Sequence, residues 1–384
     1  MKHKFSILYL GFAFVLLGCA STHRPMPTKL DYRISFSTEM ALGDFFTFYV
    51  NAEKEDQDCV WLDRNNNGVQ DADEKITSFG YGKKHELTFP LESQQMTLYG
   101  KVTAFGCSTN KITSLEVHNN PVLEYLVCSQ NNIQSLNLHS NTRLKILRCF
   151  GNKLRFLDVG NNMKLEELWC SGNRISALNV SKNTELTQLW CDRNRLTTLD
   201  VSLNTELEDI ACGGNPLTSL DIRTNTQLQS IECMGCDLRS LDVSYNTQLK
   251  ELMCSFNRLT KLDLHNNPKL EKLWFAGNRF TTLDVSANTD LYDIDCSDNK
   301  LTGEGMEAFI QSIPPCSSGE EGKLVVVNTE ANIKDKNICT AVQVSAMKAK
   351  NWMVYSYGGY FKGENIYTGA DAEPTETRNI IQAN

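Results

Sequence analysis

The segment DRNNNGVQDADE, residues 63–74, places oxygen-bearing residues at the spacing of a calcium-binding loop. Asp63, Asn65 and Asn67 would give side-chain oxygens, Val69 its carbonyl, Asp71 an oxygen directly or through water, and Glu74 both carboxylate oxygens. With only three carboxylates, the predicted affinity lies nearer the extracellular range, on the order of 10⁻⁴ to 10⁻³ M. The alternative is an Asn- and Gly-rich turn whose polar groups bond only the backbone.

A second candidate for chemistry is CMGC at residues 233–236, because C-x-x-C spacing occurs at redox and zinc sites. No second Cys or His pair lies nearby in the sequence to complete a tetrahedral zinc site. His118, His139 and His265 share one repeat position on a turn, which favours exposed surface over a catalytic base. The sequence contains no nucleophile elbow, phosphate loop or paired-carboxylate motif. It therefore predicts a protein that is not an enzyme.

Cysteines recur at a fixed interval of 21 residues. The series is Cys107, Cys128, Cys149, Cys170, Cys191, Cys212, Cys233 and Cys254, then Phe275 in the same place, and finally Cys296. The unit L-x-x-L-x-C-x-x-N-x-L-x-x-L-x-V-x-x-N-x-x fits the leucine-rich repeat signature. This period predicts a β-rich solenoid over residues 101–302, with a parallel β-sheet on its concave face.

The recurring polar residues are expected to have structural roles. The cysteines should stack as buried free thiols, because strands about 4.8 Å apart do not suit disulfides, whose Cβ atoms lie about 3.8 Å apart. Phe275 in the same row supports packing. The asparagines should satisfy backbone groups in the turn after each strand. The aspartates that recur from Asp158 to Asp284 should bond N–H groups of their own turns.

Several large side chains are predicted to point outward from the sheet. Alternation places the residue between leucine and cysteine on the concave face. The predicted ligand-binding residues on this face are Tyr125, Arg148, Phe150, Trp169, Trp190, Met253 and Trp274. Trp169 and Trp190 should stack on adjacent strands, and Trp, Tyr and Arg are enriched at binding hot spots. The alternatives are that the aromatic residues only stabilise adjacent coils, or that they receive sugar rings.

The regions outside the repeat are predicted to be caps, because an open solenoid end exposes apolar surface and an unpaired strand edge. Residues 30–100 alternate in short runs and predict a small β cap that contains the calcium-loop-like segment. Residues 303–369 predict an α/β cap, with helices in GEGMEAFIQSI and AVQVSAMKAK and strands in KLVVV and WMVYSY. Cys316 and Cys339 lie in this cap and could form a disulfide in an oxidising compartment. Residues 370–384 predict a flexible tail.

The N-terminus indicates export. Residues 1–18 combine a basic start with an apolar run that is too short to span a bilayer, as in a signal peptide. LLGC resembles the bacterial lipobox, which implies lipidation of Cys19, a tether over residues 19–29 and an outer-membrane location. The alternatives are an uncleaved anchor and a plain secretion signal. With 46 acidic against 38 basic residues, the chain lacks the basic balance of a nucleic-acid binder.

The repeat resembles the cysteine-ladder branch of bacterial leucine-rich repeat proteins, of which the internalin J type is an example, over residues 100–302. The flanking segments VWLDRNNNGVQDADE and MEAFIQSIP also look like those of lipoproteins from Bacteroides and Porphyromonas relatives. The resemblance implies a surface adhesion or protein-interaction module that binds a surface or host protein. The alternatives are a glycan-binding lipoprotein for nutrient capture and a structural envelope spacer.

Overall fold

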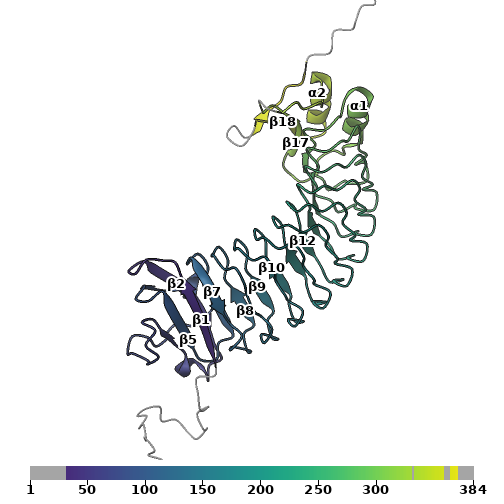
Figure 1. Cartoon of the computed structure of the whole chain (residues 1–384). Helices are drawn as coiled ribbons and strands as arrows, with labels where there is room; N and C mark the ends of the chain where they lie inside the picture. The colour runs from purple at the N-terminus through teal and green to yellow at the C-terminus, as the bar shows by residue number, and fades with distance from the viewer. Residues whose placement is uncertain (1–31, 331–332, 359–363, 371–384) are drawn as a thin grey trace, which may run out of the picture.

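The computed structural model describes residues 32–330, 333–358 and 364–370 of the chain. Figure 1 shows a curved stack of coils, with N-terminal strands at one end and the helices α1 and α2 at the other. Within the described ranges, no helix has both the length and the apolar character needed to cross a membrane. The stack of coils, each adding one strand to a long sheet, confirms the predicted leucine-rich repeat solenoid.

One strand per coil builds a long parallel sheet. These strands are β6 (Ala104–Gly106), β8 (Tyr125–Val127), β9 (Ile146–Arg148), β10 (Glu167–Trp169), β11 (Gln188–Trp190), β12 (Asp209–Ala211), β13 (Ser230–Glu232), β14 (Glu251–Met253), β15 (Lys272–Trp274) and β16 (Asp293–Asp295). Each residue pairs with the equivalent residue of the next coil, so that Trp169 lies opposite Trp190 and Trp190 opposite Ala211. Equivalent side chains of successive coils therefore form columns along the sheet.

The cysteine column lies in the solenoid core. All nine cysteines of the series and Phe275 are 0% exposed, and the thiols are free. Burial raises the pKa of thiols such as Cys128 and Cys170 to about 12, so they stay protonated and pack as apolar groups. The predicted packing role is confirmed.

Two asparagine columns connect the coils. In the first, Asn194 Nδ2 donates to the carbonyls of Cys170 and Cys191, both at 3.0 Å, and its Oδ1 accepts from the Ile175 N–H. In the second, Asn183 Nδ2 donates to the carbonyls of Val159 and Asn162 at 3.0 and 2.8 Å. Because each side chain bonds backbone groups of the preceding coil, these columns couple neighbouring repeats.

A third column has left-handed backbone. The residue two positions after each ladder cysteine, or after Phe275, has a φ between 52° and 66° in every coil from Cys107 to Cys296. Glycine, which adopts this conformation without strain, fills half of these positions. Side chains occupy the others, among them Arg193 and Phe256.

The N-terminal cap combines two sheets. Its further elements are β1 (Arg33–Thr38), β2 (Phe45–Asn51), η1 (Gln57–Cys59), β3 (Trp61–Asp63), η2 (Lys83–His85), β4 (Leu87–Pro90), β5 (Gln95–Tyr99) and β7 (Ile112–Glu116). β2 pairs antiparallel with β6 and β4 pairs with β2, which extends the long sheet past the first coil. β3, β5, β1 and β7 form a separate four-stranded sheet. Phe36, Phe46 and Phe105 pack between the two sheets and close the open end.

The C-terminal cap contains the expected helices and strands. These are α1 (Gly303–Ser312), β17 (Gly322–Asn328), α2 (Ala341–Ala349), β18 (Trp352–Tyr357) and β19 (Glu364–Ile366). β17 and β18 continue the parallel sheet, and β19 pairs antiparallel at its edge. Thr340 and Gln343 form a capping box at the start of α2.

The cap also contains an irregular coil, which corrects the predicted disulfide. Asn337 Nδ2 donates to the Cys296 carbonyl and its Oδ1 accepts from Leu301 N–H, as in a ladder asparagine. Cys339, two residues later, therefore takes the place of a core leucine and is 0% exposed. Cys316 instead contacts Ser318 and the Glu320 carbonyl. Both thiols are free, because they belong to different packing environments.

Candidate functional site

The concave face follows from alternation in three-residue strands. In nearly every coil strand the middle residue is buried and the two flanking residues are partly exposed. The exceptions are β6, in which all three residues are buried, and Ala211, a small residue that is 8% exposed. The predicted outward column of Arg148, Trp169, Trp190, Met253 and Trp274 therefore lies on the concave face.

The centre of the site is a stack of three side chains on β9, β10 and β11. The rings of Trp169 and Trp190 are 4.1 Å apart and 7° from parallel. The Arg148 guanidinium lies 3.8 Å from the Trp169 ring on its other side. Arg148 Nη2 and Nε donate to Glu167 Oε2 at 2.7 and 3.2 Å, and Trp190 Nε1 donates to Asp209 Oδ2 at 2.9 Å. The stack of Arg148, Trp169 and Trp190 is thus held at each end by a carboxylate, whereas Trp169 Nε1 is buried without a hydrogen-bond partner among the described residues.

Tyrosines extend this surface toward the N-terminus. Tyr125 packs edge-on against Tyr81, with centroids 4.9 Å apart. Tyr49 lies over Gly106, where any Cβ would collide with its ring at 2.0 Å. Burial raises the pKa of Tyr49 to about 12, although the nearby Arg148 lowers it. Sequence reasoning missed Tyr49 and Tyr81, because they come from the cap rather than from the repeat.

The remaining predicted residues lie apart from this stack. Phe150 is partly exposed beyond the end of β9 and joins no aromatic pair among the described residues. Met253 and Trp274 are neighbours on β14 and β15, separated from Trp190 by Ala211 and Glu232. The structure therefore divides the predicted site into two groups.

The second group is rich in charge. Lys272 bonds Glu251 at 2.6 Å and Lys323 bonds Glu364 at 2.7 Å. Trp274 Nε1 is buried without a well-formed hydrogen bond, although it lies near enough to the Asp293 carboxylate to lower its pKa. Burial nevertheless raises the pKa of Asp293, and it raises that of Asp295 to about 6. Four carboxylates, those of Glu251, Asp293, Asp295 and Glu364, therefore accompany two lysines, Lys272 and Lys323, at this end of the face.

Between the two groups lies a further set of carboxylates. Burial raises the pKa of Asp209 and Glu232, and Asp192 adds to the rise at Glu232. A Cβ on Gly213 would lie 2.6 Å from Glu232 Oε1, so glycine lets this carboxylate rest against the backbone. None of the ion pairs formed by the described residues includes Asp209 or Glu232. Apart from their positions in the repeat, no sequence signal distinguishes these carboxylates.

The calcium-loop-like segment forms a closed, hydrogen-bonded loop after β3. Asp63 and Glu74 are 1% and 3% exposed. Asp63 accepts from the N–H groups of Asn67 and Gly68, and Glu74 accepts from those of Arg64 and Asp71. The side-chain oxygens of Asn65 and Asn67 bond N–H groups within the loop, while their amide nitrogens donate to Asp71.

The candidate metal ligands of this loop are all oxygen atoms, which suits calcium. The side-chain oxygens of Asp63 and Asn65 lie close together, because both accept a hydrogen bond from the Asn67 N–H. In the described ranges, no three His, Cys, Asp or Glu residues group to hold a metal ion, so a calcium ion here would also depend on the Asn65 and Asn67 side-chain oxygens. The Val69 carbonyl would complete the donor set proposed from the sequence. Calcium binding remains a prediction.

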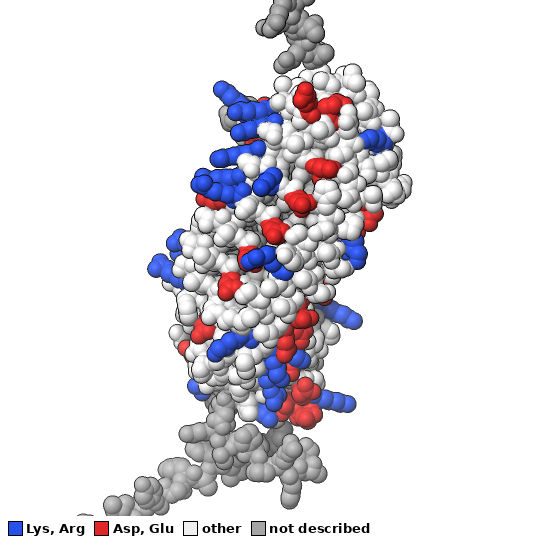
Figure 2. Space-filling view, turned by 90° about the vertical axis from the view of Figure 1, so that its right-hand side faces the viewer, with Lys and Arg blue, Asp and Glu red and all other residues white. Residues whose placement is uncertain are grey.

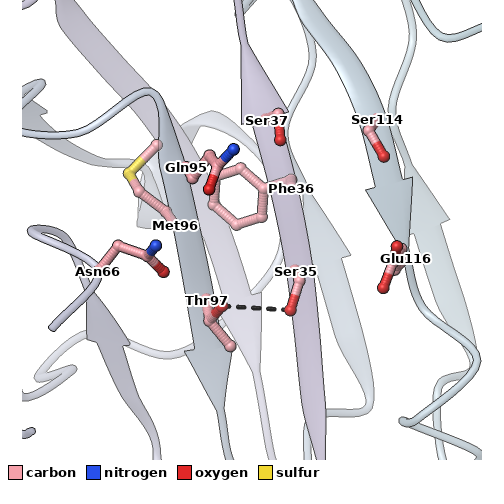
Figure 3. A pocket seen from close by; sticks show the side chains of 9 residues that line it. All are labelled: Ser35, Phe36, Ser37, Asn66, Gln95, Met96, Thr97, Ser114 and Glu116. Carbon is pink, nitrogen blue, oxygen red and sulfur yellow. Dashed lines mark hydrogen bonds between the residues drawn. The ribbon is translucent and has the colours of Figure 1, made fainter. Parts of the chain in front are cut away.

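A shallow hollow of about 200 Å³ lies on the N-terminal cap sheet (Figure 3). It is lined by hydroxyl and amide side chains on β1, β5 and β7, and Ser35 Oγ lies 3.1 Å from Thr97 Oγ1. Glu116 is the only carboxylate among its lining residues, and no histidine lines it. This hollow brings together none of the predicted site residues.

The opposite surface is built from turns. Figure 2 shows a row of acidic side chains along one face, with basic side chains beside its upper part. Asp158, Asp200 and Asp284 each accept a hydrogen bond from the N–H two residues later, at 2.9–3.0 Å. Arg223 pairs with Asp221 and lowers the pKa of that carboxyl to about 2. The predicted turn-forming role of the aspartates is confirmed.

Solved structures similar to this chain are leucine-rich repeat proteins. The functional domain of InlJ from Listeria monocytogenes, which includes a cysteine ladder, is 32% identical over 59% of this chain and 59% of that chain, with a TM-score of 0.46. The leucine-rich repeat domain of APL1B is 23% identical over 51% and 66%, with a TM-score of 0.43. A leucine-rich repeat protein of Leptospira interrogans is 18% identical over 58% and 73%, with a TM-score of 0.36. The match thus spans less than two thirds of the Listeria and APL1B domains.

No model of a known protein family matches the chain, and no curated protein matches it. The predicted lipidation site, Cys19, lies outside the described residues.

Proposed function

We propose that this protein is a non-enzymatic surface lipoprotein that mediates adhesion by binding a partner protein on the concave face of its repeats. The observation that carries the proposal is the stack of Arg148, Trp169 and Trp190, held by Glu167 and Asp209. Its side chains are already ordered, so a partner would not have to immobilise them on binding. Rigid aromatic and arginine side chains on an accessible sheet match the composition of binding hot spots.

The arrangement favours a protein partner over a glycan. Sugar rings stack on the open faces of aromatic side chains, but Arg148 and Trp190 cover both faces of Trp169, so the pair offers a single open face, on Trp190. The alternating carboxylates and cations further along the sheet, such as Lys272 and Glu251, suit the mixed polar contacts of a protein interface. Lipidation at Cys19 would tether the solenoid to the outer membrane and leave the concave face accessible.

Arrays of surface proteins and of glycans, probed with the purified protein, test this function. The comparison is the Trp169→Ala/Trp190→Ala double variant, and a Phe256→Ala variant is the control, because Phe256 is an exposed aromatic residue outside the stack. Far-UV circular dichroism would establish that all three proteins are folded. Protein ligands captured by the wild type and the control but lost by the double variant would support the proposal. Capture that survives the double substitution would refute it, and a purely glycan profile would replace it with nutrient capture.

A further inference from the structure

The aromatic stack has one closed end and one open end. At the closed end, the Arg148 guanidinium lies flat on Trp169 and is tied to Glu167 in the next coil. A guanidinium between an indole face and a carboxylate is a favourable arrangement, because cation–π attraction and a charge-assisted hydrogen bond act together. The chain thus already contains one guanidinium, that of Arg148, stacked on one end of its tryptophan pair.

At the other end, the face of Trp190 that points away from Trp169 has no such cover. The residue opposite Trp190 on β12 is Ala211, which carries only a methyl group. Among the described residues, no aromatic ring or cation stacks on this face of Trp190. The next residue in the column is Glu232 on β13. Because Ala211 is only 8% exposed and Glu232 rests against Gly213 of the same coil, a flat group would enter above Ala211 by displacing the Glu232 side chain.

The charge around this position is negative and poorly compensated. Asp209 accepts a hydrogen bond from the Trp190 side-chain N–H, just as Glu167 accepts hydrogen bonds from Arg148. The Glu232 carboxylate lies against the backbone of Gly213, two residues after Ala211. Asp192 lies near enough to raise the pKa of Glu232. Arg193, which lowers that pKa, is 84% exposed and lies 3.8 Å from Asp192. Because these carboxylates are partly desolvated, a cation supplied from outside would stabilise them strongly.

We propose that the open face of Trp190 receives the guanidinium of an arginine from a basic segment of the partner protein, with Asp209 and Glu232 as its carboxylate partners. The partner's arginine would then repeat, at the other end of the tryptophan pair, the contact that Arg148 makes within the chain. This inference rests on the proposed function and adds the chemical class of the partner. Arginine suits the position better than lysine, because its planar group both stacks and bonds two carboxylates.

The site formed by the open face of Trp190, Asp209 and Glu232 is called the arginine slot. It can be tested by titrating the full chain into labelled hexa-arginine, hexa-lysine and hexa-citrulline peptides and following their fluorescence anisotropy. Hexa-arginine is expected to bind about tenfold more tightly than hexa-lysine, and hexa-citrulline to bind least. Asp209→Asn with Glu232→Gln should weaken hexa-arginine binding by about tenfold. The matched control is Asp158→Asn with Asp200→Asn, which removes two charges at a turn position that asparagine fills in other coils, as Asn137 and Asn179 show.

Ala211→Arg gives a second, independent test, because it supplies the guanidinium from within the chain. This variant should fold, and it should lose hexa-arginine binding. Equal binding of hexa-arginine and hexa-lysine, or equal losses in the two charge-neutralised pairs, would overturn the inference, since either would indicate attraction by net charge alone.

The variants distinguish a failure of the arginine slot from a failure of the proposed function. Partner capture that is lost in Trp169→Ala/Trp190→Ala but kept in Ala211→Arg would leave the concave face as the binding surface and remove the arginine slot. Partner capture that is kept in all variants would remove both.

Discussion

Replacing Cys236 with asparagine is expected to stabilise the solenoid, because this cysteine occupies a ladder position that asparagine fills in the other coils. At a typical position of this asparagine column, which we call a rung, Asn194 Nδ2 donates two hydrogen bonds of 3.0 Å and its Oδ1 accepts a third from the Ile175 N–H. The Cys236 thiol makes one contact, 3.6 Å from the Cys212 carbonyl, and Leu217 N–H turns to the Asn215 carbonyl instead. The side chain at 236 is as buried as the ladder asparagines, 7% exposed against 7% for Asn152.

The size of the effect follows from the bonds restored. Two to three buried hydrogen bonds, each with a net value of about 0.5–1.5 kcal/mol, predict a gain of about 2 kcal/mol in the free energy of unfolding. Urea titration followed by circular dichroism would measure it. The reciprocal control is Asn194→Cys, which should lose a similar amount. A Cys236→Asn variant that is no more stable than wild type, beside a destabilised Asn194→Cys, would show that the coil at 236 has adapted to cysteine and would refute the reasoning.

Three further predictions concern titration, metal binding and backbone strain. Burial raises the pKa of Asp295 to about 6, above the roughly 3.9 of an unfolded aspartate, so its charge weakens the folded state above pH 6 and the penalty fades as the pH falls toward 4. Asp295→Asn should therefore raise the urea midpoint near neutral pH and lose this advantage in acid. Calcium at about 5 mM should stabilise the protein by about 1–2.5 kcal/mol in thermal melts, from the predicted affinity range, and Glu74→Gln should abolish the shift; unchanged melting would contradict a calcium site. Arg193→Gly should gain about 1 kcal/mol by relieving a φ of 52°, and Gly172→Ala should lose a similar amount, both measured by urea midpoints; no difference between them would argue against strain in this column.

The solenoid could be predicted from the sequence because its determinants are local. A buried cysteine every 21 residues and a leucine two residues before it fix the strand, its direction and its inward face. In-register pairing then places Trp169 opposite Trp190 without any knowledge of distant contacts. The same logic located the turn-forming aspartates.

Features that depend on the caps escaped prediction. Tyr49 and Tyr81 reach the concave face only because β2 pairs antiparallel with β6, and no periodic signal encodes that pairing. The last ladder asparagine, Asn337, follows Asn299 by 38 residues rather than 21, because α1 and β17 lie between them. Without that rung, Cys339 looked like a cap cysteine available for bonding, whereas it packs in the core.

Two departures from the repeat that remove hydrogen bonds between coils, Pro216 and Cys236, flank the coil that contains Ala211. Pro216 has no N–H, although Arg195 and Asp237 use theirs to bond the preceding coil at 2.8 and 2.9 Å. Cys236 weakens the connection to the coil that follows. A coil that exists only to build a solenoid has no reason to lose bonds on both sides, but a binding surface commonly includes the less stable parts of a fold. The same coil supplies Ala211 and Gly213, which open the face of Trp190 and make room for Glu232, so the weakest rungs and the open slot coincide.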